Sequence, residues 1–79
     1  ELYFDVSANW VRTVTGILHA DLPQAVREAF AASEYAPYHL DDIKFVECPE
    51  GDYYRLEVDI YDNDLYLHYD ATGTLLTQQ

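Results

Sequence analysis

Most of the chain alternates hydrophobic and polar positions, which is the pattern of a β-strand with one buried and one solvent-facing side. Residues 53–60 place Tyr54, Leu56, Val58 and Ile60 on one side. Residues 65–70 place Leu65, Leu67 and Tyr69 on the same kind of side. Shorter stretches with this pattern predict four further strands, at residues 2–5, 10–15, 43–48 and 74–77.

One segment has helical spacing instead. The apolar stripe recurs every three or four residues and comprises Leu22, Val26, Ala29, Phe30 and Ser33. Asp21 precedes Pro23, and Gln24 follows Asp21 by three positions, which predicts a capping box with proline in the first turn. Because Pro37 disfavours helical geometry at the residue before it, we expect the helix to end near residues 34–35.

The start of the chain repeats the pattern of its end. Residues 2–11 align with residues 67–76, and the pairs include Leu2 with Leu67, Phe4 with Tyr69, Asp5 with Asp70 and Ser7 with Thr72. Both segments read as a strand, an Asp-led turn and a second apolar stretch. A similar residue pattern that recurs at a fixed offset indicates structural repeats. We therefore expect a single domain over residues 1–79, in which 1–15 form a hairpin resembling the end of a preceding repeat and 21–77 form one full repeat.

The predicted element order is two strands, one helix and four strands. Short turns with Asp, Asn, Gly and Pro separate successive strands, so neighbours in the sequence pair as antiparallel hairpins. This order predicts an α+β fold: an antiparallel meander sheet with one helix packed on one face.

The charge balance narrows the classes of partner. Four basic residues stand against fifteen acidic ones, for a formal net charge of −11. This charge repels phosphate backbones and anionic membrane surfaces, so nucleic-acid binding is excluded and a basic protein partner is favoured. No apolar run approaches the roughly 20 residues that span a bilayer, so no membrane insertion is expected. The chain contains no Met, and we expect it to be a trimmed or processed product.

The acidic turn at residues 59–64 is the main candidate for a metal site. Its oxygen ligands are Asp59, Asp62, Asn63 and Asp64. Carboxylates near a turn suit a hard cation, but the spacing lacks the EF-hand pattern. A hydrophilic hairpin turn accounts for these residues better than a calcium site does. A calcium-responsive structural domain remains a third alternative, and we predict no specific metal site or cofactor.

Catalytic patterns are absent from the sequence. His19, His39 and His68 lack the local spacing of zinc ligands. Asp70 and Gly73 flank two residues, whereas the aspartic-protease signature has one residue between Asp and Gly. Cys48 is the only cysteine, so we expect no internal disulfide and a small buried thiol on a strand. The chain is therefore expected not to be an enzyme.

A surface remains as the candidate site. If the apolar sides of the strands face the helix, alternation places the other residues on the opposite face. The candidate binding residues there are Tyr53, Arg55, Glu57, Tyr66 and His68. Tyrosine and arginine on an open sheet are typical of recognition surfaces. The alternative is ordinary cross-strand pairing on a solvated face.

Several segments, taken in order, resemble the PepSY-like family of small secreted bacterial domains, of the Bacteroides type. They are the helix opening at 22–26, the Pro-Tyr-x-Leu-x-x-Ile stretch at 37–43, the strand region at 51–58 and the Asp-led turn region at 67–73. The resemblance implies a fold similar to the β-lactamase inhibitor protein, tandem repeats, and export to the periplasm or cell exterior. It implies no catalytic residues.

These observations together predict a non-enzymatic, exported binding or interaction module. The alternative is an inhibitor or regulator of an extracytoplasmic enzyme such as a peptidase. Packing against a neighbouring repeat is also expected, because the echo implies one. The sequence names neither the partner nor the number of repeats in a parent protein.

Overall fold

A computed structural model describes residues 1–78, and its elements follow one another along the chain with short connections. The strands are β1 (Leu2–Phe4), β2 (Trp10–Gly16), β3 (His39–Glu47), β4 (Tyr53–Ile60), β5 (Asn63–Tyr69) and β6 (Leu75–Gln78). A 3₁₀ turn, η1 (His19–Asp21), and one α-helix, α1 (Gln24–Ala31), lie between β2 and β3. The predicted domain end at Gln79 lies outside the described residues.

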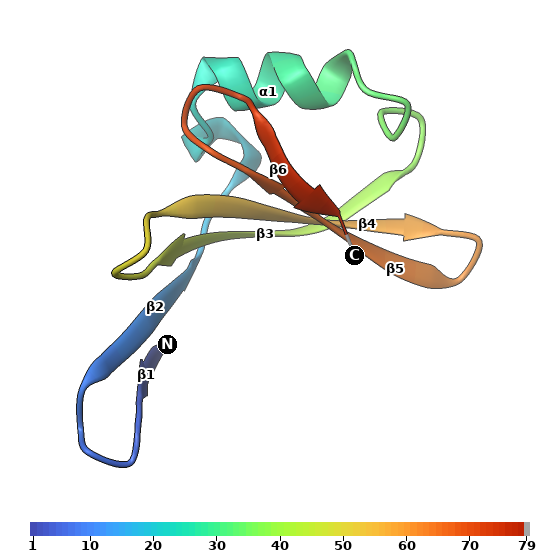
Figure 1. The fold of residues 1–79 in the computed structure, drawn as a ribbon. Coiled ribbons are helices and arrows are strands. Elements are labelled where there is room, and N and C mark those ends of the chain that lie inside the picture. The colour runs from blue at the N-terminus through green and yellow to red at the C-terminus, as the bar shows by residue number, and fades with distance from the viewer. Residues whose placement is uncertain (79) are drawn as a thin grey trace.

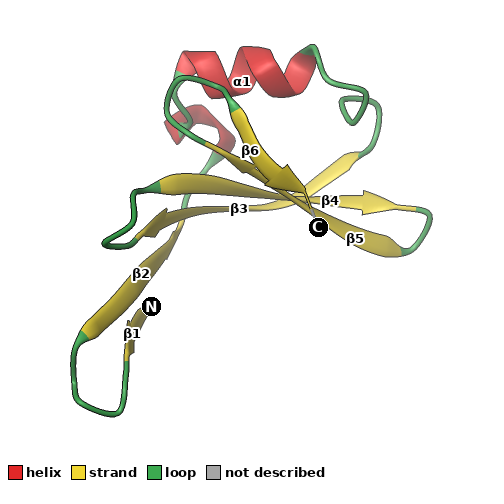
Figure 2. Cartoon of the chain, in the orientation of Figure 1, coloured by secondary structure: helices red, strands yellow, loops and turns green. Residues whose placement is uncertain are grey.

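The strands form one antiparallel sheet in the order β1-β2-β3-β4-β5-β6. Figure 1 shows α1 lying across one face of this sheet, while the β1–β2 hairpin extends away from the helix. The same arrangement is seen by element type in Figure 2. The predicted α+β meander with a helix on one face is therefore confirmed.

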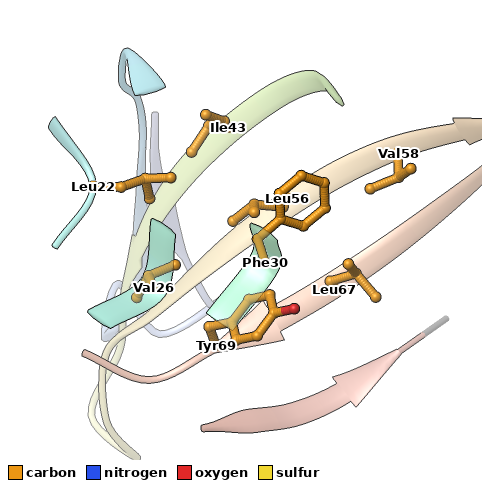
Figure 3. Packing of buried hydrophobic residues seen from close by; sticks show 8 residues of the cluster. All are labelled: Leu22, Val26, Phe30, Ile43, Leu56, Val58, Leu67 and Tyr69. Carbon is orange, nitrogen blue, oxygen red and sulfur yellow. The ribbon is translucent and has the colours of Figure 1, made fainter. Parts of the chain in front are cut away.

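The hydrophobic core lies between α1 and the central strands (Figure 3). Its buried side chains are Leu22, Val26, Phe30, Ile43, Leu56, Val58, Leu67 and Tyr69. In the register of the sheet, Leu56 pairs with both Ile43 and Leu67, so these three side chains share the helix-facing side. The alternation read from the sequence thus assigned the two faces of β4 and β5 correctly.

The helix is shorter than predicted at its C-terminal end. It ends at Ala31, not near residues 34–35. The cause is Ser33, whose hydroxyl donates to the Phe30 carbonyl at 2.6 Å and whose backbone N–H donates to the same oxygen at 3.0 Å. Ser33 thereby takes the acceptor that the next helical N–H would use, and the chain turns before Pro37 acts.

The predicted capping box at Asp21 was also wrong. The Asp21 carboxylate accepts the Leu18 backbone N–H at 3.0 Å, so it closes the preceding 3₁₀ turn. Pro23 occupies the N-cap position of α1, without a side-chain cap. Gln24 instead donates to Glu28 one turn later at 3.3 Å.

The third strand begins earlier than predicted, at His39 instead of Ile43. The pairing of β3 with β4 shifts register between Leu40 and Asp42, so Asp41 is an extra residue in the strand. A bulge of this kind keeps Leu40 opposite Val58 although the intervening sequence breaks alternation. This break concealed the first half of the strand from the sequence pattern.

Candidate binding face

The five predicted binding residues lie together on the face of the sheet opposite α1, here called the outer face. Tyr53, Arg55 and Glu57 alternate along β4, and Tyr66 and His68 alternate along β5. In the register, Arg55 lies opposite His68 and Glu57 lies opposite Tyr66. The sequence pattern therefore placed these residues on a shared, partly solvent-exposed surface.

Aromatic stacking orders one end of this patch. The rings of Tyr53 and His68 stack with centroids 4.5 Å apart and planes inclined by 28°. Burial lowers the pKa of His68 below its usual 6.5, and the neighbouring Arg55 charge lowers it further. Because the neutral imidazole is favoured, the stack presents an uncharged, rigid aromatic surface near neutral pH.

A second aromatic contact holds Arg55. Its guanidinium carbon lies 5.4 Å from the centroid of the Tyr66 ring, within the range of a cation–π interaction. The Tyr66 hydroxyl donates to the Glu57 carboxylate, which raises the pKa of this phenol. The Tyr66 ring, the Arg55 guanidinium and the Glu57 carboxylate thus hold one another in place across β4 and β5.

The outer face extends beyond the predicted residues onto β1, β2 and β3. Tyr3 lies opposite Arg12, whose guanidinium carbon is 4.4 Å from the Tyr3 ring centroid. Lys44 lies between Gly16 and Arg55 in the register. Sequence reasoning missed these three side chains because it extended the outward pattern only along β4 and β5. Continuing the same alternation along β3, through Lys44 and Val46, would have placed Lys44 on the outer face.

A hollow of about 370 Å³ opens between the N-terminal hairpin and the central strands. Its lining includes Glu1, Tyr3, Arg12, Val14, Lys44 and Arg55. Three of the four basic residues of the chain thus lie around one hollow, while Arg27 belongs to α1. We call this region the cationic hollow.

A second hollow of about 560 Å³ lies beside the β3–β4 turn and shares Arg12 with the first. Val11, Tyr53 and Leu76 contribute apolar surface to it, and Cys48 lies at its edge. The Cys48 thiol donates to the Gly51 carbonyl at 2.9 Å, and burial raises its pKa. Cys48 is half-buried and lies after the end of β3, so the expectation of a small buried thiol on a strand was wrong.

The acidic turn between β4 and β5 is a tight hairpin. Tyr61 and Asp62 both have positive φ, at 48° and 68°, and the Asn63 amide donates to the Tyr61 carbonyl at 3.3 Å. Within residues 1–78, no group of three or more His, Cys, Asp or Glu side chains is arranged to hold a metal ion. In the same range, no helix is long and apolar enough to cross a membrane.

The chain was compared with known families and solved structures. Residues 1–77 match the model of a family described as a proposed beta-lactamase-inhibitor-like, PepSY-like family. A search of curated proteins found no match. Among solved structures, a BLIP-like protein from Bacteroides fragilis is 30% identical and superposes with a TM-score of 0.90.

Two further solved structures have the same fold. A DUF2874 family protein from Bacteroides uniformis and a protein described as a proposed periplasmic one from Bacteroides eggerthii are each 27% identical, with TM-scores of 0.90. These alignments cover 99% of this chain but only 59% of each relative, and 57% of the Bacteroides fragilis protein. The chain therefore spans less than two thirds of their length. On the family match over residues 1–77 and the shared fold, the chain belongs to the PepSY-like family.

Proposed function

We propose that this domain is a non-enzymatic, exported recognition module that binds a protein partner through its outer sheet face. The observation that carries the proposal is the ordered aromatic surface opposite the helix. Tyr53 is stacked on His68, and Tyr66 lies under Arg55. Side chains that are already fixed lose little conformational freedom on binding, so such a surface favours association.

The charge of the domain supports a partner with a basic surface. The net charge of −11 attracts cationic proteins over distances of about one Debye length, roughly 8–10 Å at physiological salt. This attraction raises the association rate more than the final affinity. We therefore propose a basic protein partner whose association slows as the salt concentration rises.

Export to the periplasm or cell exterior is part of the same proposal. It is supported by the Bacteroides eggerthii relative, which is described as a proposed periplasmic protein. The domain would then meet its partner in the envelope or outside the cell. Binding studies should therefore use proteins of those compartments.

We also propose that residues 21–77 are one full repeat and that residues 1–15 end a preceding one. Leu2 and Phe4 are 64% and 57% exposed although they occupy positions equivalent to buried residues of β5. Exposed apolar side chains on an outer strand are typical of a surface that another unit covers. The greater length of the solved relatives is consistent with a neighbouring unit.

A second candidate function is inhibition or regulation of an extracytoplasmic enzyme such as a peptidase. The specific support is the family description and the BLIP-like relative. Because one fold hosts many functions, similarity of fold supports inhibition less strongly than the ordered outer face supports protein binding. An inhibitor would bind an enzyme in a fixed ratio and lower its activity, whereas another recognition module would bind without that effect.

Capture from a Bacteroides envelope fraction tests the proposal. The immobilised domain is compared with a Tyr53→Ala/Tyr66→Ala variant at a temperature well below the melting point of both. We expect a partner retained by the wild type at fixed stoichiometry and lost by the double variant. Assays of the captured protein with and without the domain then decide between recognition and inhibition.

Tyr61→Ala is the matched control. Tyr61 is 83% exposed and lies in the β4–β5 turn, away from the stacked rings. This variant should retain the partner fully. If the double variant captures the same partner as well as the wild type does, the outer face is not the binding surface.

A further inference from the structure

Among residues 1–78, the two arginines of the outer face have no acidic partner. The chain has fifteen acidic residues against four basic ones, so a surface arginine would ordinarily find a carboxylate nearby. In the described part of the chain, neither Arg12 nor Arg55 has a carboxylate oxygen within 4.0 Å. Each guanidinium lies against a tyrosine ring instead. Both therefore retain N–H groups that can bind an anion from outside.

The sheet register brings these side chains around one space. Arg12 on β2 and Arg55 on β4 lie on either side of Lys44 on β3, and all three line the cationic hollow. A Cβ atom at Gly16 would lie 3.6 Å from the Lys44 ammonium, so the ammonium lies directly over this glycine. Val14 is 9% exposed and lines the hollow between them.

The local charge fits an anion with a single negative charge. Lys44 forms an ion pair with Asp42 at 3.2 Å, and Glu1 also lines the hollow. These two carboxylates oppose the three cationic side chains Arg12, Lys44 and Arg55, and the N-terminal ammonium of Glu1, which donates to the Val14 carbonyl, adds a further positive charge. The hollow is therefore net positive, and a singly charged anion meets less repulsion from the acidic domain than a doubly charged one does.

Guanidinium geometry favours a carboxylate. Arginine presents parallel N–H groups that match the two oxygens of a carboxylate, and stacking on a ring leaves these groups free at the edge. Beside this hollow, Val11, Tyr53 and Leu76 line the second one, which offers apolar surface. A carboxylate next to an apolar side chain is the chemistry of a short peptide segment.

We propose that the cationic hollow binds the carboxylate of an Asp or Glu side chain in a segment of the partner protein, with an adjacent apolar side chain in the second hollow. This rests on the proposed function, because it assigns an anchor within the same outer face. It also refines the charge expectation. The partner has a basic or neutral surface, but its docking segment carries one acidic side chain.

Two short peptides test this with the isolated domain. Acetyl-Ala-Glu-Phe-Lys-amide is neutral overall, and acetyl-Ala-Gln-Phe-Lys-amide has one positive charge. Long-range attraction to the acidic domain predicts tighter binding of the Gln peptide, whereas binding in the cationic hollow predicts tighter binding of the Glu peptide. The two explanations therefore predict opposite orders of affinity. NMR follows the side-chain N–H signals of Arg12 and Arg55 and the backbone amide of Lys44.

We expect the Glu peptide to shift these signals saturably and to bind at least about tenfold more tightly than the Gln peptide, in line with loss of a charge-assisted hydrogen bond. Arg12→Gln/Arg55→Gln should abolish this preference. Arg27→Gln, which removes the same charge from α1, should leave it unchanged. Arg55→Lys, which keeps the charge but loses the paired N–H groups, should give intermediate affinity.

Equal binding of the two peptides would overturn the proposal, as would retention of the preference in the double arginine variant. Tighter binding of inorganic phosphate than of the Glu peptide would overturn the carboxylate assignment. Preserved chemical-shift dispersion in each variant confirms that it is folded. If the envelope partner is lost in the Tyr53→Ala/Tyr66→Ala variant but retained after Arg12→Gln/Arg55→Gln, the face stands and only the carboxylate anchor fails.

Discussion

The Asp-led turns at residues 5–9 and 70–74 have the same local structure in different surroundings. The Asp5 carboxylate accepts the backbone N–H groups of Ser7 and Asn9, both at 2.9 Å. The Asp70 carboxylate accepts those of the second and fourth residues after it at 2.9 and 3.0 Å. The third residue after the Asp has positive φ in both turns, 62° at Ala8 and 86° at Gly73.

Burial is where the two regions differ. Leu67 and Tyr69, before the second turn, are 0% and 2% exposed, whereas their counterparts Leu2 and Phe4 are 64% and 57% exposed. The helix covers the C-terminal hairpin and leaves the N-terminal one uncovered (Figure 1). Side-chain chemistry therefore fixes the turn locally, and tertiary packing decides whether the flanking strand joins the core.

The largest expected difference is between Leu67→Ala and Leu2→Ala, which change equivalent positions in the two copies. Leu67→Ala should lower the free energy of unfolding by roughly 2–5 kcal/mol, because it leaves a cavity beneath α1. Leu2→Ala should cost less than about 0.5 kcal/mol, since its side chain is exposed. Urea denaturation of both variants measures this. Similar losses would mean that the N-terminal hairpin is packed as firmly as the C-terminal one.

A smaller effect is expected from exchanging glycine and alanine in the two turns. In Gly73→Ala the added Cβ would lie 2.5 Å from the Ala25 carbonyl oxygen at positive φ, so we expect a loss of about 2–3 kcal/mol. Ala8→Gly should change stability by less than about 0.5 kcal/mol, because relief of its positive φ offsets the added flexibility of the unfolded chain.

Thermal unfolding of the two variants provides the measurement. An undisturbed melting temperature in Gly73→Ala would show that the second turn does not press on the helix. A large gain in Ala8→Gly would show that the first turn is more strained than its exposure implies.

Removing the two turn carboxylates should give a still smaller, unequal pair of effects. Asp70→Ala should lower the melting temperature more than Asp5→Ala, because the turn at Asp70 lies against α1 and unfolds with the core. A hydrogen bond from the Thr72 hydroxyl, with further backbone N–H bonds, holds the pKa of Asp70 below its usual 3.8. Equal losses of melting temperature in the two variants would show that the two turns contribute equally to stability.

The same carboxylate gives the sign of the acid dependence. Because the folded-state pKa of Asp70 is lowered, its stabilising effect is present above about pH 3.8 and is lost as the pH falls below that value. The difference in melting temperature between wild type and Asp70→Ala should therefore shrink at about pH 2.5. A difference that persists unchanged in acid would contradict this.

The smallest effect concerns His68, whose counterpart in the first copy is Tyr3. The pKa of His68 is lowered by burial first and by Arg55 second, so the unfolded chain binds more protons near pH 6.5 and below. The His68 contribution to stability is full above that pH and is lost as the pH falls through 6.5 toward the folded value. His68→Tyr copies the first hairpin and should reduce the drop in melting temperature between about pH 7.5 and about pH 5.5. An unaltered pH dependence would contradict the assignment.

Sequence alternation placed the five candidate residues on one face correctly, because a period of two fixes which side chains share a face once one face is buried. It missed the contribution of Arg12 and Lys44. These residues are separated by 32 positions of sequence, and only the pairing of β2 with β3, and of β3 with β4, brings them around one hollow. When two strands pair across a helical connection, the sequence near each strand does not indicate which strand is its partner.

The sequence by itself determined the strand faces, the Asp-led turns and the element order, because each depends on chemistry within a few residues. The end of α1 is also set locally, by the hydrogen bonds from Ser33 to the Phe30 carbonyl, although the apolar pattern did not reveal it. Only the tertiary structure decided how β3 accommodates Asp41 as a bulge and which copy of the echoed strand is buried. It also decided that Arg12 and Arg55 lie around one hollow, where neither forms an ion pair with a carboxylate of residues 1–78. These outcomes depend on competing hydrogen bonds and on contacts between segments far apart in the chain, which local patterns do not encode.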